Sequence, residues 1–174
     1  MEQDTHIVKS YDEEMKEINN SILDIGSLVE NQLKEALGAL KNQDTELADK
    51  VIQADNLIDE KFRELDQKLV LILGKRQPMA TDLRTIFSAI KMNKDLERLG
   101  DHSTNIAKRT AMIELVLPEK PVRDILRMGE HVRVMIAKVI QSFVNFSAEE
   151  AKIVWEMDEA VSYTHLTLPT ICSV

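Results

Sequence analysis

The chain has 174 residues, a formal net charge of −8, 44% hydrophobic residues, 4% aromatic residues and one cysteine. Its apolar content suffices for a packed core and excludes a disordered chain. The negative charge disfavours a nucleic-acid binder and direct attachment to anionic lipids. No apolar run approaches the ~18–20 residues that span a bilayer, and a single cysteine excludes an internal disulfide. We therefore expect a globular, cytoplasmic protein that binds no nucleic acid.

Apolar residues recur every three or four positions along most of the chain, which is the period of one helix face. Few Gly and Pro residues interrupt this pattern, so the helices are expected to be long. We predict helices over 7–40, 45–73, 78–113 and 122–146. Asp44 is the expected N-cap of the second helix, Gly74 its C′ residue, and Pro78 part of the first turn of the third. The fold class is therefore all-α.

The chain contains an internal repeat. Aligning 26–59 with 129–162 gives seven identities in 34 positions without a gap, and the turn between the helices stays in register. We expect one complete three-helix repeat at 1–117 and an incomplete second repeat at 118–161. The segment 162–174 is rich in Thr and Ser and contains Pro169. We expect it to be a non-native or disordered tail, with a natural short C-terminal tail as the alternative.

Two pairs of carboxylates stand at i, i+4 spacing, Asp55 with Asp59 and Glu97 with Asp101. Glu97 and Asp101 are expected to project toward the apolar stripe of their helix, where carboxylates without partners are costly. Adjacent antiparallel helices would gather all four around one site, and such oxygen ligands suit magnesium, manganese or iron. The spacing leaves three alternatives open, namely solvated helix faces, a local ion pair with Arg98, and a hydrogen-bonded Asp101.

One run of residues carries a family resemblance. The run 95–102 (DLERLGDH), with NIA at 105–107, closely resembles the third-helix signature of the PhoU family, the accessory proteins of the phosphate-specific transport system. The run 74–84 (GKRQPMATDLR) resembles the hairpin before that helix, and 11–15 (YDEEM) resembles the family's N-terminal segment. The resemblance extends over roughly 1–161 and implies a PhoU-like helical bundle of two three-helix repeats.

The resemblance also implies a metal site. Family members bind metal through paired acidic residues, and the pattern carries over to Asp55, Asp59, Glu97 and Asp101, with iron, manganese, zinc or magnesium as the expected ions. In the second repeat Asp158 alone remains, because Ser162 stands at its partner position. A complete second site is therefore not expected.

The implied function is regulatory. The resemblance predicts a negative regulator of the phosphate-starvation response and of phosphate uptake, which contacts the phosphate transporter ATPase and a sensor histidine kinase. A homodimer that reaches the membrane only through these partners is expected. No nucleophile–base pair or glycine-rich phosphate loop indicates an enzyme. The alternatives are a ferritin-like di-iron protein, whose Glu-x-x-His motif is absent here, and a helical scaffold whose acids have no special role.

Overall fold

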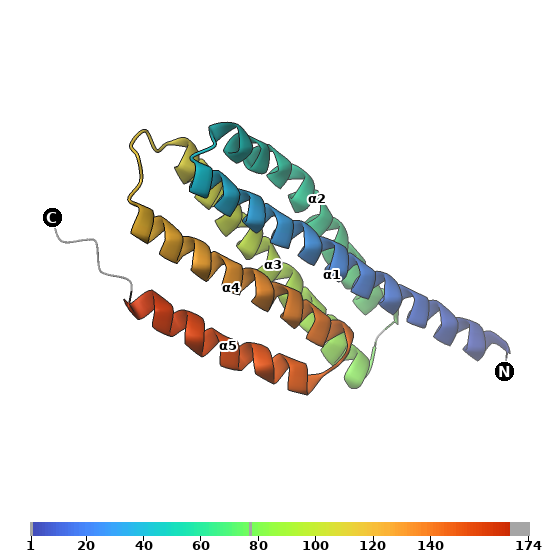
Figure 1. Ribbon diagram of the computed structural model, residues 1–174. Coiled ribbons are helices and arrows are strands. Elements are labelled where there is room, and N and C mark those ends of the chain that lie inside the picture. The colour runs from blue at the N-terminus through green and yellow to red at the C-terminus, as the bar shows by residue number, and fades with distance from the viewer. Residues whose placement is uncertain (1, 77, 168–174) are drawn as a thin grey trace.

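The computed structural model describes residues 2–76 and 78–167, and this part of the chain is helical without a strand. Its elements are α1 (Glu2–Asn42), α2 (Thr45–Arg76), α3 (Thr81–Ala111), α4 (Glu119–Val144) and α5 (Ala148–Thr167), as Figure 1 shows. The all-α prediction is confirmed. No helix in this part of the chain is both long and apolar enough to cross a membrane.

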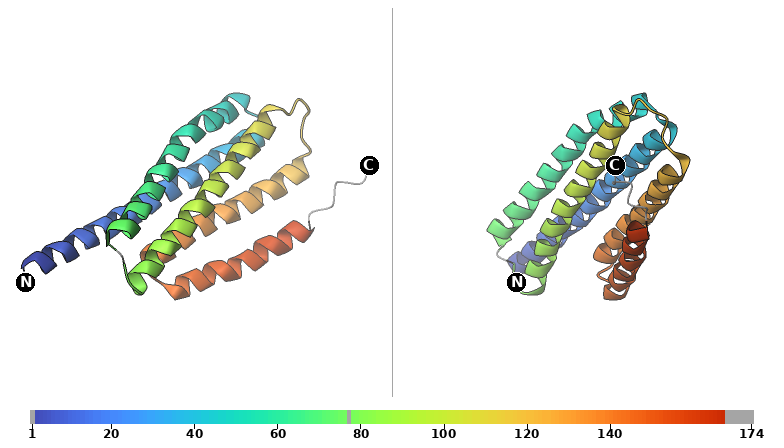
Figure 2. Two further views of the ribbon diagram at one scale, coloured as in Figure 1. Left: turned by 180° about the vertical axis from the view of Figure 1, so that it is seen from behind. Right: turned by 90° about the vertical axis from the view of Figure 1, so that its left-hand side faces the viewer.

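Helices α1, α2 and α3 each contact the other two and form a three-helix bundle. Helix α4 packs against α1, and α5 packs against α4 on the outside of the molecule (Figure 2). The N-terminal turns of α1 extend past the ends of α2 and α3 (Figure 1). Helix α1 is thus the element that joins the bundle to the α4–α5 hairpin.

The core is aliphatic, as the scarcity of aromatic residues predicts. Helices α1 and α2 contribute large side chains such as Ile22, Val29, Leu65 and Leu69, all at most 1% exposed. Each such side chain contributes about 1.5–3 kcal/mol through its burial. Helix α3 instead buries mainly small residues, which let it approach its two neighbours closely. These small residues are Ala89, Gly100, Ser103, Thr104 and Ala107.

The internal repeat is visible at the turns that follow α1 and α4. Gln43 and Phe146, which are equivalent in the repeat, both adopt a left-handed backbone with φ of 49° and 52°. The residue after each turn caps the following helix. Asp44 Oδ1 accepts a hydrogen bond from the Leu47 N–H at 2.9 Å, and Ser147 Oγ accepts one from the Glu150 N–H at 3.2 Å. The two turns therefore share one geometry, and the predicted cap at Asp44 is confirmed.

The contact between α1 and α4 has approximate two-fold symmetry. A Cβ atom added at Gly26 would overlap the side chain of Ile140, and one added at Gly129 would overlap the methyl groups of Leu37. Gly26 is equivalent to Gly129 in the repeat, and Leu37 to Ile140, so the same contact is made twice. Two glycines therefore set the close approach of these antiparallel helices.

An ion pair lies near the centre of this interface. Arg133 Nη2 donates to Glu30 Oε1 at 2.9 Å, and the two residues are 103 positions apart, the offset of the repeat. A residue that contacts its own repeat equivalent lies close to the symmetry axis. The second guanidinium nitrogen binds Glu130 at 2.7 Å.

Two predicted helix boundaries are wrong. Gly74 is not a C′ residue, because α2 continues to Arg76, whose guanidinium binds Glu14 of α1 and so extends the helix past the glycine. Pro78 is not in the first turn of α3, which begins at Thr81 after a left-handed Ala80 with φ of 49°. Ala80, and not Gly74, therefore supplies the left-handed residue of this connection.

Helix α5 continues past Ser162 to Thr167, so the helical backbone does not stop where the composition changes. The proline that would interrupt a helix stands later, at position 169, and residues 168–174 lie outside the described part of the chain. The non-native origin of 162–174 stays a prediction, as do the domain limits 1–117 and 118–161.

We predict opposite effects for alanine at two glycines. Gly129→Ala overpacks the α1–α4 contact, and we expect it to lower the free energy of unfolding by about 1 kcal/mol after the gain in helix propensity is counted. Gly74→Ala is the control, because a Cβ there meets nothing within 4 Å. It should raise stability by up to ~1 kcal/mol. Urea denaturation followed by circular dichroism measures both, and equal stability of the two variants would contradict the close contact.

We also predict that the Glu14–Arg76 pair makes stability depend on pH. Hydrogen bonds of 3.0 Å from the Arg76 guanidinium to both carboxylate oxygens lower the Glu14 pKa below its ordinary value, against a smaller opposing effect of burial. Its stabilisation is therefore present above that ordinary value and is lost as pH falls through the lowered one. Glu14→Gln should cost about 0.5–1 kcal/mol at neutral pH and progressively less in acid, unlike the exposed control Glu13→Gln.

Candidate functional site

The polar centre of the three-helix bundle is a hydrogen-bonded triad of Gln32 from α1, Asp55 from α2 and Thr104 from α3. The Gln32 amide donates to Asp55 Oδ1 at 3.0 Å and to Thr104 Oγ1 at 2.9 Å, and the Thr104 hydroxyl donates to the same Asp55 oxygen at 2.8 Å. Gln32 and Thr104 are 3% and 1% exposed. Two donors on one carboxylate oxygen compensate for placing Asp55 against the core.

Gly100 of α3 makes room for this triad. A Cβ atom at position 100 would lie 3.2 Å from Gln32 Oε1 and 3.8 Å from the ring of Phe62. Gln32 Oε1 is buried and has no hydrogen-bond partner among the described residues. The orientation of the Gln32 amide follows from its neighbours. The opposite orientation would place its oxygen against the Asp55 carboxylate, and two acceptors cannot form a hydrogen bond.

Asp59 lies one turn along α2 from Asp55, and the other three predicted carboxylates all act on its pKa. Partial burial raises the pKa of Asp59, and the negative charges of Asp55, Asp101 and Glu97 raise it further, against the opposing charge of Arg63. Helices α2 and α3 thus bring the other three acids close enough to Asp59 to raise its pKa. A cation at this position would relieve that repulsion.

Glu97 and Asp101 lie at the edge of the core face of α3, not on it. Glu97 is half-buried and Asp101 is exposed, because the face that packs inward is the one carrying Ala89, Leu96 and Gly100. Asp101 is therefore exposed and not turned toward the core as expected, whereas Glu97 shares a pocket with Ile90 of the apolar stripe. Glu97 forms an ion pair with Lys94 at 2.5 Å. Arg98, considered as a local partner for these acids, approaches Asp95 at 3.8 Å.

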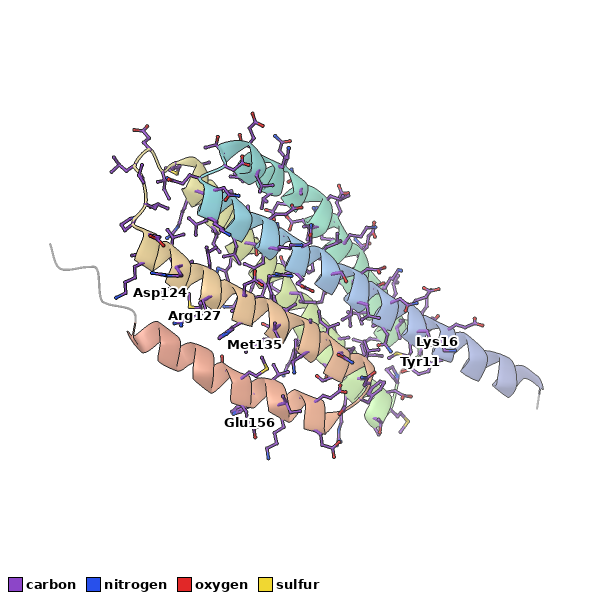
Figure 3. The ribbon with its side chains drawn as sticks, in the orientation of Figure 1. Tyr11, Lys16, Asp124, Arg127, Met135 and Glu156 are labelled. Atoms are coloured by element: carbon purple, nitrogen blue, oxygen red, sulfur yellow. The ribbon has the colours of Figure 1, made fainter. Side chains whose placement is uncertain are left out.

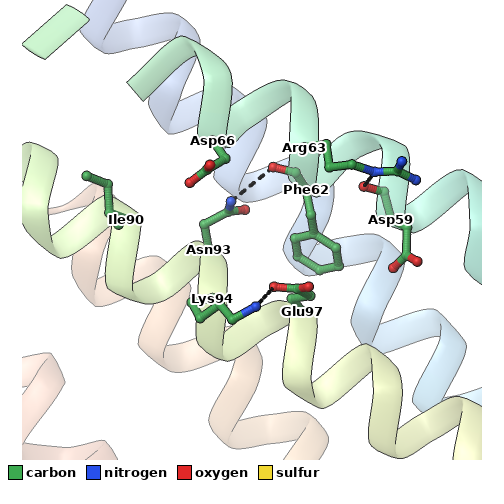
Figure 4. Close-up of a pocket in the computed structure, with 8 residues that line it drawn as sticks. All are labelled: Asp59, Phe62, Arg63, Asp66, Ile90, Asn93, Lys94 and Glu97. Atoms are coloured by element: carbon green, nitrogen blue, oxygen red, sulfur yellow. Dashed lines mark hydrogen bonds and ion pairs between the residues drawn. The ribbon is translucent and has the colours of Figure 1, made fainter. Parts of the chain in front are cut away.

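A pocket of about 360 Å³ opens between α2 and α3 beside these acids (Figure 4). Carboxylates, two basic side chains, one amide and two apolar side chains surround it. They are Asp59, Phe62, Arg63, Asp66, Ile90, Asn93, Lys94 and Glu97. The pocket therefore includes two of the four predicted ligands, Asp59 and Glu97, and places hard oxygen donors around one space.

The donor set fits a hard cation, but the acids are not arranged for direct coordination. Among residues 11, 13–76 and 78–158, whose side chains the structure describes, no three His, Cys, Asp or Glu residues are placed to hold a metal ion. Carboxylate and amide oxygens are nevertheless the ligands that magnesium and manganese prefer. Metal held by the pairs would require the exposed Asp101 to turn inward and Glu97 to leave Lys94.

The second repeat has no counterpart of the triad in the described residues. Asp158, equivalent to Asp55, is exposed on α5. The residue equivalent to Gln32 is Met135, labelled on α4 in Figure 3, which has no amide to hold a carboxylate. The structure therefore joins Asp158 to none of the other predicted ligands.

Three residues of this region were not among the predicted site residues, namely Gln32, Asn93 and Thr104. Each is at least 95% buried on a helix that packs in the bundle. Their signal in the sequence is a polar residue in register with an apolar stripe, as with Gln32 between Val29 and Ala36. A polar residue at such a position indicates a buried hydrogen bond or a site.

The PhoU domain family model matches residues 22–110 and 125–172 of the chain. The phosphate-specific transport system accessory protein PhoU homolog of Rhizobium meliloti is 35% identical over 164 residues, which cover 94% of this chain and 69% of that protein. PhoU of Escherichia coli is 32% identical over 157 residues, covering 90% of this chain and 65% of that protein. The chain thus spans about two thirds of the length of these relatives.

Solved structures give the same result. The crystal structure of PhoU from Pseudomonas aeruginosa has a TM-score of 0.83 and 34% identity, covering 90% of this chain and 76% of that chain. The regulatory protein PhoU from Streptococcus pneumoniae also has a TM-score of 0.83, with 30% identity over 91% of this chain and 74% of that chain. Similar sequences and superposable helices over nearly the whole chain show that it belongs to the PhoU family.

Proposed function

We propose that the chain is an accessory protein of phosphate transport and a negative regulator that represses the phosphate-starvation response and limits phosphate uptake. The observation that carries this proposal is the family match together with the names of the relatives, which are accessory proteins of the phosphate-specific transport system. The similar protein of Streptococcus pneumoniae is named a phosphate transport system regulatory protein. The names of the first two relatives describe an accessory role, and that of the third a regulatory role.

In this proposal the chain acts in the cytoplasm through protein–protein contacts. Its partners are the ATPase subunit of the phosphate transporter and a phosphate-sensing histidine kinase, and it reaches the membrane only through them. The net charge of −8 supports this arrangement, because it opposes direct attachment to anionic lipids.

Association into a homodimer is part of the same proposal. Ala151 and Trp155 on α5 are equivalent to Ala48 and Ile52 on α2, yet they are exposed, Trp155 by 78%. The α4–α5 hairpin therefore presents apolar surface that the first repeat covers with a third helix. Exposed apolar surface of this kind favours association with another protein surface.

A metal site at Asp55, Asp59, Glu97 and Asp101 completes the proposal, with iron, manganese, zinc or magnesium as the ion. The mutual repulsion at Asp59 and the hydrogen bonds that hold Asp55 support it. A bound cation would supply positive charge between α2 and α3. The residues of the chain hold Asp55 in place and bring α2 and α3 together around that charge.

We predict that the carboxylate pairs carry metal after purification without chelator. The double variant Asp59→Asn/Asp101→Asn should lose at least ~tenfold in metal affinity, a loss of the size seen for weakened metal sites. Without metal it should be slightly more stable than the wild type, by about 0.2–0.5 kcal/mol per relieved repulsion. Elemental analysis and thermal melting measure the two effects. Asp95→Asn, an exposed change on α3, is the control, and equal metal content in all three proteins would refute the site.

We predict that the purified chain binds the transporter ATPase and the sensor kinase, measured by biolayer interferometry. Expression in a bacterium lacking its own PhoU should lower a phosphate-starvation reporter in phosphate-rich medium. The Gly129→Ala variant, which loosens the α1–α4 contact, should repress less at equal protein level. Binding to neither partner, together with an unchanged reporter, would overturn the regulatory proposal whatever the result for metal.

A further inference from the structure

A second pocket lies between the N-terminal turns of α3 and the turn that joins α4 to α5, and its volume is about 390 Å³. Its lining is mainly apolar and includes Met92, Val139 and Phe143, while Arg84 supplies a positive charge. In the part of the chain that the structure describes, the backbone of α3 packs against neither α4 nor α5. The pocket is therefore apolar surface that the described chain leaves uncovered.

The first repeat fills the equivalent position with a packed helix. Ala36 and Ala48 are fully buried there, in a cluster with Ala107 of α3. Their equivalents in the second repeat, Val139 and Ala151, line the pocket instead. The pocket thus corresponds to a position that receives side chains from another helix.

A large side chain projects from α5 close to this pocket. Trp155 is the single tryptophan of the chain and is 78% exposed. Ala148, Ala151 and Trp155 recur at intervals of three and four positions, so they lie on one face of α5. The two alanines form the α5 side of the pocket, and the indole stands one turn further along the helix. One face of α5 therefore carries a hollow and a protrusion next to each other.

Such a face is complementary to a second copy of itself. When two α5 helices pack antiparallel about a two-fold axis between Ala151 and Trp155, each Trp155 lies opposite the partner's Ala151. In the same register each Asp158 lies opposite the partner's Ala148. Because both alanines line the pocket, the indole of one copy enters the pocket of the other. An isologous contact of this kind is closed and joins two copies only.

Charge complementarity supports the same register. Arg84 and Asp158 are exposed and form neither a hydrogen bond nor an ion pair with the described residues. Lys152, the basic residue nearest to Asp158 on α5, approaches Glu156 at 3.8 Å. A carboxylate opposite the partner's Ala148 lies at the pocket that contains Arg84, so each copy supplies the charge that the other lacks.

The pocket also suits an indole in its polar groups. A tryptophan side chain buries about 150–250 Å² and its N–H requires an acceptor when it is buried. The hydroxyl groups of Thr85 and Ser88 line the pocket and have lone pairs that accept a hydrogen bond. The apolar lining accommodates the ring, and the hydroxyls accommodate its one donor.

We propose that two copies of the chain associate through α5, with Trp155 of each copy inserted into the pocket of the other and Asp158 paired with the partner's Arg84. The proposal rests on the homodimer of the proposed function and names the surface that forms it. A second copy is the occupant because α5 itself supplies the aromatic ring and the carboxylate at the spacing that the pocket and Arg84 require.

Size-exclusion chromatography with light scattering measures the mass of the purified chain over a range of concentrations and tests the pairing. We expect a dimer for the wild type, and association at least ~tenfold weaker for Trp155→Ala, because buried tryptophans carry much of the binding free energy of interfaces. Ile153→Ala is the matched control. Ile153 is an exposed apolar residue on the other side of α5, so this variant should associate like the wild type.

Exchanging the two charges tests the register. Arg84→Glu and Asp158→Lys should each weaken the dimer several-fold, because like charges then face each other, and the double variant should recover wild-type association. Both side chains are exposed, so the variants keep the fold, and circular dichroism checks each protein. The fluorescence of the single tryptophan reports the same site in these variants, since its emission should shift to longer wavelength when the dimer dissociates on dilution.

Four outcomes are distinguishable. Weaker association in Trp155→Ala and in both single charge variants, with recovery in the double variant, supports the pairing. A dimer that persists in Trp155→Ala overturns it and leaves the homodimer standing with another surface. Weak association in the double variant as well overturns the register. A wild-type chain that is monomeric at every concentration overturns both the pairing and the homodimer and leaves this face to a different protein, while the regulatory proposal has its own test.

Discussion

Helix α1 has to be buried on two sides at once, and the rest of the structure depends on that constraint. It contacts α2 and α3 on one side and α4 on the other. Gly26 lets α4 approach closely, and Gln32 faces the opposite side, where it binds Asp55 and Thr104. A single long helix thereby holds the symmetric interface between the repeats and the polar centre of the first repeat.

The polar groups between α2 and α3 have a structural cost that the aliphatic core offsets. Asp55 is compensated by two donors, whereas Asp59 is left among like charges and Asn93 keeps an acceptor without a donor. Groups that are partly satisfied in this way are unusual in a core packed by aliphatic residues. Asp59 and Asn93 line one pocket between α2 and α3, where the small residues of α3 let the two helices approach closely.

Most of the fold could be predicted because its signals are local. The apolar period predicted the first four helices, and Asp44 was recognisable as an N-cap. The repeat offset of 103 residues relates two turns of the same geometry. The end of α2 and the start of α3 were mispredicted from Gly74 and Pro78. Helix α2 continues to Arg76, which binds Glu14, a residue distant in the sequence. The carboxylate pairs were visible as spacing, but their place at the edge of the α3 face depends on how three helices pack. The burial of Asn93 could not be predicted for the same reason, because it depends on how α2 and α3 pack.

The connectivity of the helices makes stability uneven along the chain. Among the described residues, α5 contacts α4 and no other helix, and Val154 is a buried apolar residue on it, whereas α1, α2 and α3 support one another. Detaching α5 exposes little core and leaves the bundle intact, so local opening there requires less free energy than global unfolding. Backbone amides of α5 should exchange with deuterated solvent first, those of α4 next, and those around Gln32 last. The molecule therefore opens from its second repeat inward, and the groove between α2 and α3 lies in the part that opens last.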